Sequence, residues 1–524
     1  MDKPDPTQIK KSRIAINSLS SIATRILSLV FLLWFHRHLL KSIDTEEYSL
    51  LPLVLGGFAA AQTILELMGG GIARYVTEAA ALHDKQRIQA ITSSMLPVMW
   101  GTTVVFLAVS GIAIWKLDWF VEVEDVYRGQ MQLMVALFAI ALAYEFVTYP
   151  YQVGLQAHQE YVKINLILLA QEILRTLVLL VLLVAVSVKV HWVVVANVLG
   201  MIFASTLRMV YSRRTLPELR RVPGGGDWQT VREILSFSGW SSLGSLAEML
   251  KKSAPVLLLN RLGSADGLSA YHLGSLAFRH MQRMMSQLSG PLQPVLTILH
   301  ARKDDELVRK IYLRGGRYFL WISLGATMLL VSLGAPLIEL YIPEKNKLLA
   351  PLVTLVMWLL VCTFPFIYAS VMLYRVVVAK ADIRGFFLLA LFAQVLSVGS
   401  MYVLLVEYDM DVRGVAWAML GSVAVTHVFG FWPMGLKKAG VSLSEFCQQT
   451  LLLGFAPAVV SLGVAYGIHG RFDTTTLVGI VWQGALLVGV YFLVFFACLR
   501  PEDRHDLGTF LETARRRALA LTGR

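Results

Sequence analysis

Runs of apolar residues long enough to cross a lipid bilayer recur along most of the chain, separated by short polar segments. Each run has about 20 residues, the length that an α-helix needs to cross a hydrocarbon core about 30 Å thick. The pattern predicts an all-α polytopic membrane protein with about 14 transmembrane helices, since no segment between the runs could hold a soluble domain. The predicted helices are centred near Leu27, Ala59, Val104, Ala141, Leu179, Phe203, Ala247, Met284, Gly325, Leu359, Ala393, Leu420, Pro457 and Val488.

The first run follows Lys10, Lys11 and Arg13, an arrangement that superficially matches the charged start of a secretory signal peptide. The run itself contains polar residues, including Ser21 and Arg25, and it has no small-x-small cleavage site. We therefore expect this helix to be retained in the protein.

Composition supports lipid as the main solvent. Hydrophobic residues make up 56% of the chain and charged residues only 16%, whereas soluble domains carry about 25% charged residues. The net charge of +12 is unevenly distributed. Most Lys and Arg residues fall in the segments that share a side with the N-terminus, including 208–232, 302–317 and the C-terminal tail. This is the positive-inside pattern, so we predict a multi-pass protein of the cytoplasmic (inner) membrane with both termini in the cytoplasm, and no nucleic-acid partner.

Three pairs of similar loop sequences indicate an internal repeat. The segment SIDTEEYSLL is similar to GSADGLSAYHLG, AALHDKQRIQAI to HARKDDELVRKI, and AHQEYVKINLILLAQ to AKADIRGFFLLALFAQ. The matched positions are Asp44 with Asp266, Asp84 with Asp304, and Ala157 with Ala379. Because the offset spans an even number of helices, the repeats are parallel, and parallel repeats place substrate between the two halves.

The repeat predicts two six-helix lobes around a central cavity, followed by two further helices. The expected boundaries are an N-lobe at 1–215, a cytoplasmic linker at 216–235, a C-lobe at 236–440, helices 13 and 14 at 441–500, and a basic cytoplasmic tail at 501–524.

Six basic residues lie inside the apolar runs, where a charge at the helix centre costs at least about 2.5 kcal/mol to insert. We expect each of them to face a partner or a water-filled cavity, and we predict that together they bind substrate. They are Arg25, Arg175, Lys251, Lys252, Arg279 and Arg283.

Acidic residues in the runs are fewer: Glu66, Glu145, Glu172 and Glu248. Glu172 can pair with Arg175 at i,i+3, and Glu248 with Lys252 at i,i+4, so these two charges can be neutralised on their own helices. A surplus of positive charge remains, which predicts a cavity that binds an anion. Arginine suits phosphate in particular because its planar fork offers paired donors and stays charged.

Two patterns match enzyme motifs. His300 and Asp305 have the H-x4-D spacing of acyltransferases, and Asp409 and Asp411 form a D-x-D pattern like that of metal-dependent glycosyltransferases. Both lie in short loops without a domain that could bind a donor. The glycines at 224–226 are not followed by GK[ST], so they do not form a phosphate-binding loop. The three cysteines have no metal-ligand spacing. We expect neither an enzyme nor a bound cofactor.

The chain resembles the oligosaccharide flippases of polysaccharide biosynthesis, in the superfamily that also contains multidrug extruders and lipid II flippases. The segments that carry the resemblance are EEYSLLPLVLGG, MGGGIARYVTEAAALHD, NRLGSADGLSAYHLGSLAFRHM, QPVLTILHARKDDELVRK and RGVAWAMLGSVAV. Arg25 in TRILS is similar to the helix 1 arginine of lipid II flippases. The chain departs from the family in helix 7, where Ala254 and Pro255 occupy positions that are often polar or charged.

The resemblance implies alternating access between two lobes, with a polyprenyl-pyrophosphate-linked oligosaccharide of O-antigen, exopolysaccharide or lipid II type as cargo. Membrane lipids, and a polymerase or other glycan-assembly proteins, are the partners it suggests. Two alternatives stay open. A multidrug antiporter would need an acid-lined cavity for cationic cargo, and a glycan polymerase or ligase would need a large external catalytic loop.

Ion coupling is the remaining question, with Glu66, Glu145 and Glu172 as the candidate residues. Glu145 has no basic residue at i±3 or i±4, and an unpaired buried carboxylate is costly. Glu145 therefore either binds a proton or Na+ during the cycle, or forms a salt bridge across helices to Arg25 or Arg175. Membrane potential alone is the third possible drive.

Overall fold

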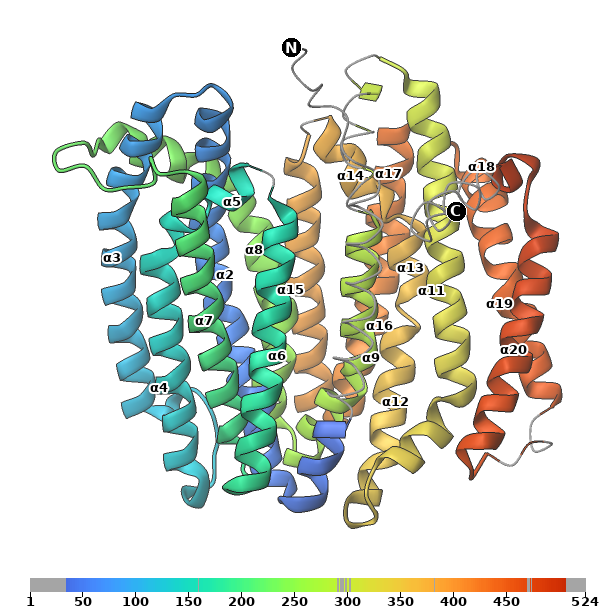
Figure 1. Cartoon of the computed structure of the whole chain (residues 1–524). Helices are drawn as coiled ribbons and strands as arrows, with labels where there is room; N and C mark the ends of the chain where they lie inside the picture. Colours follow the sequence, from blue (N-terminus) through green and yellow to red (C-terminus); the bar gives the residue numbers. More distant parts are fainter. Residues whose placement is uncertain are drawn as a thin grey trace, which may run out of the picture.

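The computed structural model describes residues 34–505, except 159, 290–291, 293–295, 297–298, 301–302, 381, 469–471 and 473. Every regular element within this part of the chain is a helix (Figure 1). Eleven segments are long and apolar enough to cross a membrane, and each contains one of the predicted helix centres. The protein is therefore an all-helical, multi-pass membrane protein. The first predicted helix, around Leu27, lies mostly outside the described residues.

The described residues of the first half form five long α-helices and one short one. They are α2 (Thr45–Ala81), α3 (Lys85–Trp115), α4 (Asp125–Thr148), α5 (Gly154–Ala157), α6 (Tyr161–Ala185) and α7 (His191–Thr215). A helical segment at 34–42 precedes them.

The second half begins with α8 (Trp228–Leu262) and α9 (Ala265–Ser289). It continues through α11 (Asp305–Tyr341), α12 (Ala350–Val361), α13 (Phe364–Ala369), α14 (Met372–Ala379), α15 (Arg384–Val406), α16 (Asp411–Thr426) and α17 (Trp432–Ala439). The C-terminal helices are α18 (Leu443–Phe446), α19 (Leu453–Gly467) and α20 (Leu477–Cys498), and they pack against the outer side of α11 (Figure 1).

Helices α8 and α9 are long enough to span a membrane, yet they are not among the eleven apolar segments. Their sequences contain Glu248, Lys251 and Lys252 in α8 and Arg279 and Arg283 in α9. Helix α8 lies between the halves, since it packs along α2 on one side and α15 on the other. The most polar long helices thus lie where the halves meet.

The two halves repeat a local structure as well as a helix order. Helix α3 begins after Asp84 and α11 after Asp304, and each aspartate accepts a hydrogen bond from the backbone N–H three residues on, at 2.9 and 3.1 Å. The residue before each cap, His83 or Lys303, has a positive φ of 56° or 57°. The same turn therefore starts equivalent helices in both halves.

Successive long helical spans, some of which comprise two or three labelled helices, alternate in direction, so the loops gather at two ends of the bundle (Figure 1). We call the end that carries residues 216–227 the linker end, and the other the seam end. Residues 303–304 and 499–505 also lie at the linker end. Helix α8 already begins at Trp228, inside the expected linker of 216–235, because Asp227 accepts hydrogen bonds from the N–H groups of Gln229 and Thr230 and caps it.

Candidate functional site

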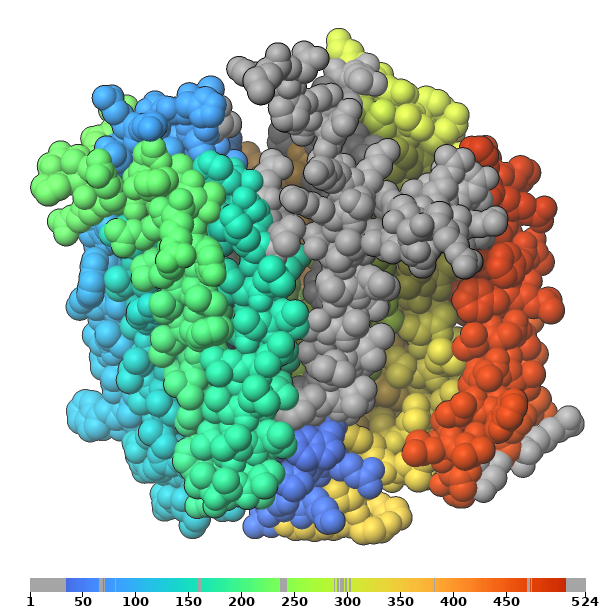
Figure 2. Space-filling model, in the orientation of Figure 1, coloured from blue at the N-terminus to red at the C-terminus, as the bar shows by residue number. Residues whose placement is uncertain are grey.

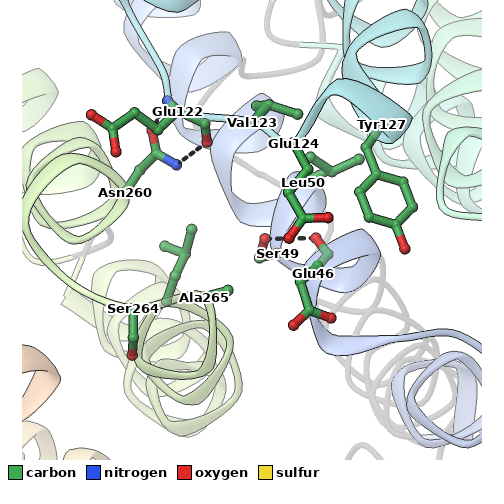
Figure 3. Close-up of a pocket in the computed structure, with 11 residues that line it drawn as sticks. Glu46, Ser49, Leu50, Glu122, Val123, Glu124, Tyr127, Asn260, Ser264 and Ala265 are labelled. Carbon is green, nitrogen blue, oxygen red and sulfur yellow. Dashed lines mark hydrogen bonds between the residues drawn. The ribbon is translucent and has the colours of Figure 1, made fainter.

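The halves are joined at the seam end by a set of contacts that we call the seam. Asn260, near the end of α8, donates to the backbone carbonyl of Glu122 and accepts from its N–H, both at 2.7 Å (Figure 3). The neighbouring Arg261 binds the carboxylate of Glu122 at 3.0 Å and the carbonyl of Asp118. The α3–α4 connection of the first half is thereby held against the α8–α9 turn of the second.

Further seam contacts connect the start of the first half with the end of α11. Lys345 binds the Asp44 carboxylate at 2.6 Å, and Asn346 donates to Thr45 Oγ1 at 3.1 Å. Arg37 donates to the carbonyl of Leu340 at 2.9 Å. Figure 2 shows the blue residues of the first half against the yellow residues of the second at the bottom of the molecule. The seam end of the bundle is closed between the halves in this conformation.

A cavity of about 120 Å³ lies within the seam (Figure 3). Its walls come from the start of α2, the α3–α4 connection and the α8–α9 turn, and they include Glu46, Glu124, Tyr127 and Ser264. The carboxylates of Glu46 and Glu124 make this part of the seam acidic.

Deeper between the halves lies a cluster of four polar side chains, three of them buried and one, Arg279, part-buried, which we call the seam cluster. Tyr48 Oη lies 2.8 Å from His36 Nδ1, and the His36 ring packs edge-on against that of His272, with centroids 5.2 Å apart. Arg279 donates to the backbone carbonyl of His272 at 3.0 Å and contacts its Nδ1 at 3.3 Å. His36 and Tyr48 belong to the first half, whereas His272 and Arg279 belong to the second.

Several predicted substrate-binding residues lie in or near the seam cluster. The charges of Arg175 on α6 and Arg279 on α9 both act on the His36 ring, and the charge of Arg283 acts on Arg279. Arg175, Arg279 and Arg283 thus share one region between the halves. Arg175 also binds Glu172 on its own helix, as the i,i+3 spacing predicted. Arg25 lies outside the described residues.

The lysines of α8 have a different environment. Lys251 and Lys252 lie 3.7 and 3.5 Å from the Glu248 carboxylate, so the pairing predicted for Lys252 is confirmed and extends to Lys251. The charge of Lys251 acts on His427, which begins the π-helix η4 (His427–Phe431) of the second half. Both lysines thus lie beside Glu248, and Lys251 also lies near η4.

Glu145 has a partner that the sequence analysis did not consider. The proposed salt bridge led to Arg25 or Arg175, but the observed one joins Glu145 Oε1 to Arg208 Nη2 at 2.9 Å, between α4 and α7. Arg208 was assigned to the basic cytoplasmic segment, whereas α7 continues to Thr215 and carries this guanidinium along the face of α4. The Glu66 side chain is outside the described part of the structure.

A buried arginine, Arg317, was also missed. Arg317 of α11 and Asp503, which follows α20, form an ion pair in which each side chain is 1% exposed. Arg317 also donates to the carbonyl of Gln449 at 2.7 Å, and Tyr318 donates to Asp503 at 2.8 Å. We call this group the anchor, because it fastens the segment after α20 to α11 at the linker end.

The linker follows the first half closely. Ser93 and Ser94 of α3 accept the backbone N–H groups of Val222 and Asp227 at 2.9 and 2.8 Å. Lys85 binds Glu218 at 3.1 Å, and this contact lowers the pKa of the Glu218 carboxyl. The linker therefore connects the halves along a defined path on α3.

The two enzyme-like patterns have structural explanations. Asp409 and Asp411 form a turn with positive φ, and Asp411 accepts hydrogen bonds from the backbone N–H and hydroxyl of Ser264, at 3.1 and 2.7 Å. Asp305 is exposed in the first turn of α11. The D-x-D pattern thus connects two turns of the second half at the seam end.

Comparison with known proteins identifies the family. Residues 81–350, just over half of the chain, match the polysaccharide biosynthesis protein family. EpsK of Bacillus subtilis (strain 168), described as an uncharacterized membrane protein, is 19% identical over 350 residues, which are 65% of this chain and 67% of EpsK.

Solved structures show the fold. The lipid II flippase MurJ, in an inward closed conformation, aligns with a TM-score of 0.69 and 11% identity over 92% of this chain and 99% of MurJ. An inward-facing multidrug resistance MATE family transporter of the MOP superfamily aligns with a TM-score of 0.62 and 15% identity over 79% and 95% of the two chains. This protein therefore belongs to the polysaccharide biosynthesis protein family and has the fold of the MOP-superfamily transporters.

Proposed function

We propose that this protein is a flippase that moves a polyprenyl-pyrophosphate-linked oligosaccharide from the inner to the outer leaflet of the cell inner membrane by alternating access. Two six-helix lobes, at 1–215 and 236–440, would surround the cavity, and the two C-terminal helices would complete a set of about 14. Both termini would face the cytoplasm, because the linker end carries the basic loops. O-antigen, exopolysaccharide and lipid II type glycans all carry the required headgroup.

One observation carries this proposal: the cationic region around Arg279. Within the described part of the chain, the ionisable groups found to interact with Arg279 are His36, Tyr48, Tyr271, His272 and Arg283, none of which is a carboxylate. A buried positive charge without an acid is stable only beside water or a mobile anion. A pyrophosphate supplies that anion, and guanidinium groups can bind it through paired donors. Arg175, Arg279 and Arg283 would hold it, together with Arg25, Lys251 and Lys252 if cargo binding brings these closer.

The pairing of the acids argues against a cationic drug as cargo, although the fold is shared with multidrug transporters. Glu145 is paired with Arg208, Glu172 with Arg175, and Glu248 with Lys251 and Lys252. An acid-lined cavity would need at least one of these carboxylates free of a basic partner. The ion-coupling role of Glu66, Glu145 and Glu172 stays a prediction, and for Glu145 and Glu172 it would require an ion pair to open during the cycle.

The experiment is complementation of a flippase-deficient strain by Arg279 variants, with membrane levels of each variant checked. Arg279→Ala should abolish glycan export, because it removes a charge-assisted contact of about 1.5 to 3 kcal/mol with the phosphate. Arg279→Lys should retain part of the activity, since it keeps the charge but loses the fork. Arg220→Ala, at an exposed linker position, is the matched control and should export normally. Normal export by well-expressed Arg279→Ala would contradict an anionic cargo at this site.

Topology is tested separately by labelling single cysteines with an impermeant reagent in intact cells. Asp305→Cys and Arg221→Cys replace exposed residues at the linker end, so both should be protected until the membrane is permeabilised. Ser212 is unsuitable for this purpose because it is buried and binds the backbone of Gln152 and Leu155. Labelling of Asp305→Cys from outside would mean that the linker end faces away from the cytoplasm, and it would contradict the proposed topology.

A further inference from the structure

We propose that His272 is a proton-binding site that controls opening of the seam end, because its Nδ1 can hold either the Arg279 guanidinium or a proton, but not both. The proposal extends the proposed function, since it assigns the ion that regulates the conformational cycle to a residue outside the predicted acidic candidates. It concerns the protein without cargo and can be tested without a transport assay.

The proton position on His272 follows from its partners. A guanidinium only donates hydrogen bonds, so the Arg279 Nη2 contact at 3.3 Å requires Nδ1 of His272 to be the acceptor. The proton of the neutral ring is then on Nε2. This atom is buried, and within the described structure it has no hydrogen-bond partner. The neutral imidazole therefore accepts a hydrogen bond at Nδ1, while the N–H group at Nε2 has no acceptor within the described structure.

The surroundings of His272 oppose a second charge while the seam is closed. The groups that act electrostatically on His36, Tyr48, His272 and Arg279 come from the 34–42 segment and from α2, α6, α9 and α11. Beyond the cluster itself, they are Arg175, Tyr271, His280, Arg283 and Tyr341. In the described residues, this set includes three arginines, counting Arg279, and one of them, Arg175, is bound to the carboxylate of Glu172. A proton on His272 would thus place an imidazolium against the Arg279 guanidinium, whose described hydrogen-bond partners both belong to His272 and are uncharged.

The position of the cluster converts this repulsion into movement of the halves. His36 and Tyr48 approach from the first half, and His272 and Arg279 from the second, so the buried ring contacts at 5.2 and 6.0 Å lie across the interface. A protonated His272 can be solvated only if Arg279 leaves Nδ1 and water enters between the rings. Protonation therefore favours separation at the seam end, and it also releases Arg279 to meet an anionic group.

Seam opening can be measured directly between two spin labels. Trp119 and Leu348 are 70% and 92% exposed, and they lie on the α3–α4 connection and on η3 (Glu344–Leu349), on opposite sides of the seam. Cysteines at these positions, with Cys362, Cys447 and Cys498 replaced, carry nitroxides in the full chain reconstituted in lipid nanodiscs. The distance distribution is recorded from about pH 8 to about pH 5, the range in which histidine titrates.

The expected result is a shift to longer distances as the pH falls, with that shift absent in His272→Gln. The glutamine carbonyl can still accept the hydrogen bond from Arg279, but it cannot bind a proton. His38→Gln is the matched control, since this histidine is on the same helical segment as His36 and stacks on Trp34 at 5.4 Å, outside the cluster. It should respond to pH like the wild type.

Two outcomes would overturn the proposal: a wild-type distance that does not change with pH, or a His272→Gln variant that changes as the wild type does. If His272→Gln does not fold, Arg279→Gln replaces it. This variant removes the guanidinium that competes with a proton for Nδ1, so the change in spin-label distance with pH must become smaller. A change as large as in the wild type would equally overturn the proposal. A protein that opens with acid but exports no glycan would contradict the proposed cargo and leave this proton site standing.

Discussion

Two arginines inside the helix bundle, the buried Arg317 and the part-buried Arg279, differ in the groups that surround them. In the anchor, Arg317 has a carboxylate, a backbone carbonyl and the ring of Trp321, whose centroid is 5.5 Å away. In the seam cluster, Arg279 has a neutral imidazole and a backbone carbonyl. A guanidinium paired with a buried carboxylate stabilises the fold, and removing either partner is strongly destabilising. A guanidinium without an acid in its described surroundings is available for a ligand, and it lies where the halves meet.

The largest effect should come from breaking the anchor. Arg317→Ala leaves Asp503 buried without its counter-ion, so it should lower the free energy of unfolding by about 3 to 5 kcal/mol. Thermal unfolding of the purified protein measures this. Arg314→Ala is the matched control: Arg314 pairs with Glu502 one turn away, but that carboxylate is 57% exposed, so the loss should be about 0 to 1 kcal/mol. Equal losses in the two variants would contradict a special role for burial.

The contrast sharpens when the same substitution is made at both sites. Arg279→Met removes only contacts to neutral groups, so its cost in unfolding free energy should be about 1 kcal/mol, well below that of Arg317→Met. Export should show the opposite order, with Arg279→Met inactive and the folded fraction of Arg317→Met active. Stability and export that fall together at both sites would mean that Arg279 is structural as well.

These two sites also show what sequence reasoning can reach. Helix positions followed from apolar runs because burial in lipid requires them, and the repeat was visible because Asp84 and Asp304 cap equivalent helices. The pairs Glu172–Arg175 and Glu248–Lys252 followed from helical spacing. Contacts between helices did not follow. Neither the rotation of α7 that brings Arg208 to Glu145 nor the path of the chain that returns Asp503 to Arg317 is encoded in local spacing. His36 and His272 were missed because a count of charges ignores neutral imidazoles.

An intermediate effect is expected at the Glu145–Arg208 pair, which resembles the anchor in chemistry but is less buried, with side chains 12% and 26% exposed. Glu145→Gln should cost about 1 to 3 kcal/mol of unfolding free energy, because it leaves Arg208 without its counter-charge. Glu145→Leu combined with Arg208→Met should recover most of that loss. Full export by Glu145→Gln with either a pH or a Na+ gradient would exclude this carboxylate as the coupling site.

The smallest effect concerns the linker end, where acid should weaken the contacts only at a lower pH than it does at the seam. The hydrogen bond from Lys85 holds the pKa of Glu218 below its usual value. A carboxyl with a lowered pKa in the folded state stabilises that state at neutral pH, and this contribution is lost only as the pH falls through the folded-state pKa. An imidazole in water titrates at a higher pH than a carboxyl, so mild acid favours the open seam, in which the histidines meet water, while the linker stays attached to α3.

Glu218→Gln reproduces the protonated state of this contact at neutral pH, where trypsin can report on it. The exposed Arg220 and Arg221 are the cleavage sites, and their rate of cleavage should rise by less than about fivefold, because an exposed ion pair is weak. Lys85→Met removes the same ion pair from the other side and should give a similar rise, whereas Asp409→Asn, at the seam end, should give none. The hydrogen bonds from Val222 and Asp227 to Ser93 and Ser94 remain in all three variants, and they limit the effect. A linker cleaved as fast as an unstructured peptide after Glu218→Gln would mean that this ion pair, rather than the two serines, holds the linker on α3.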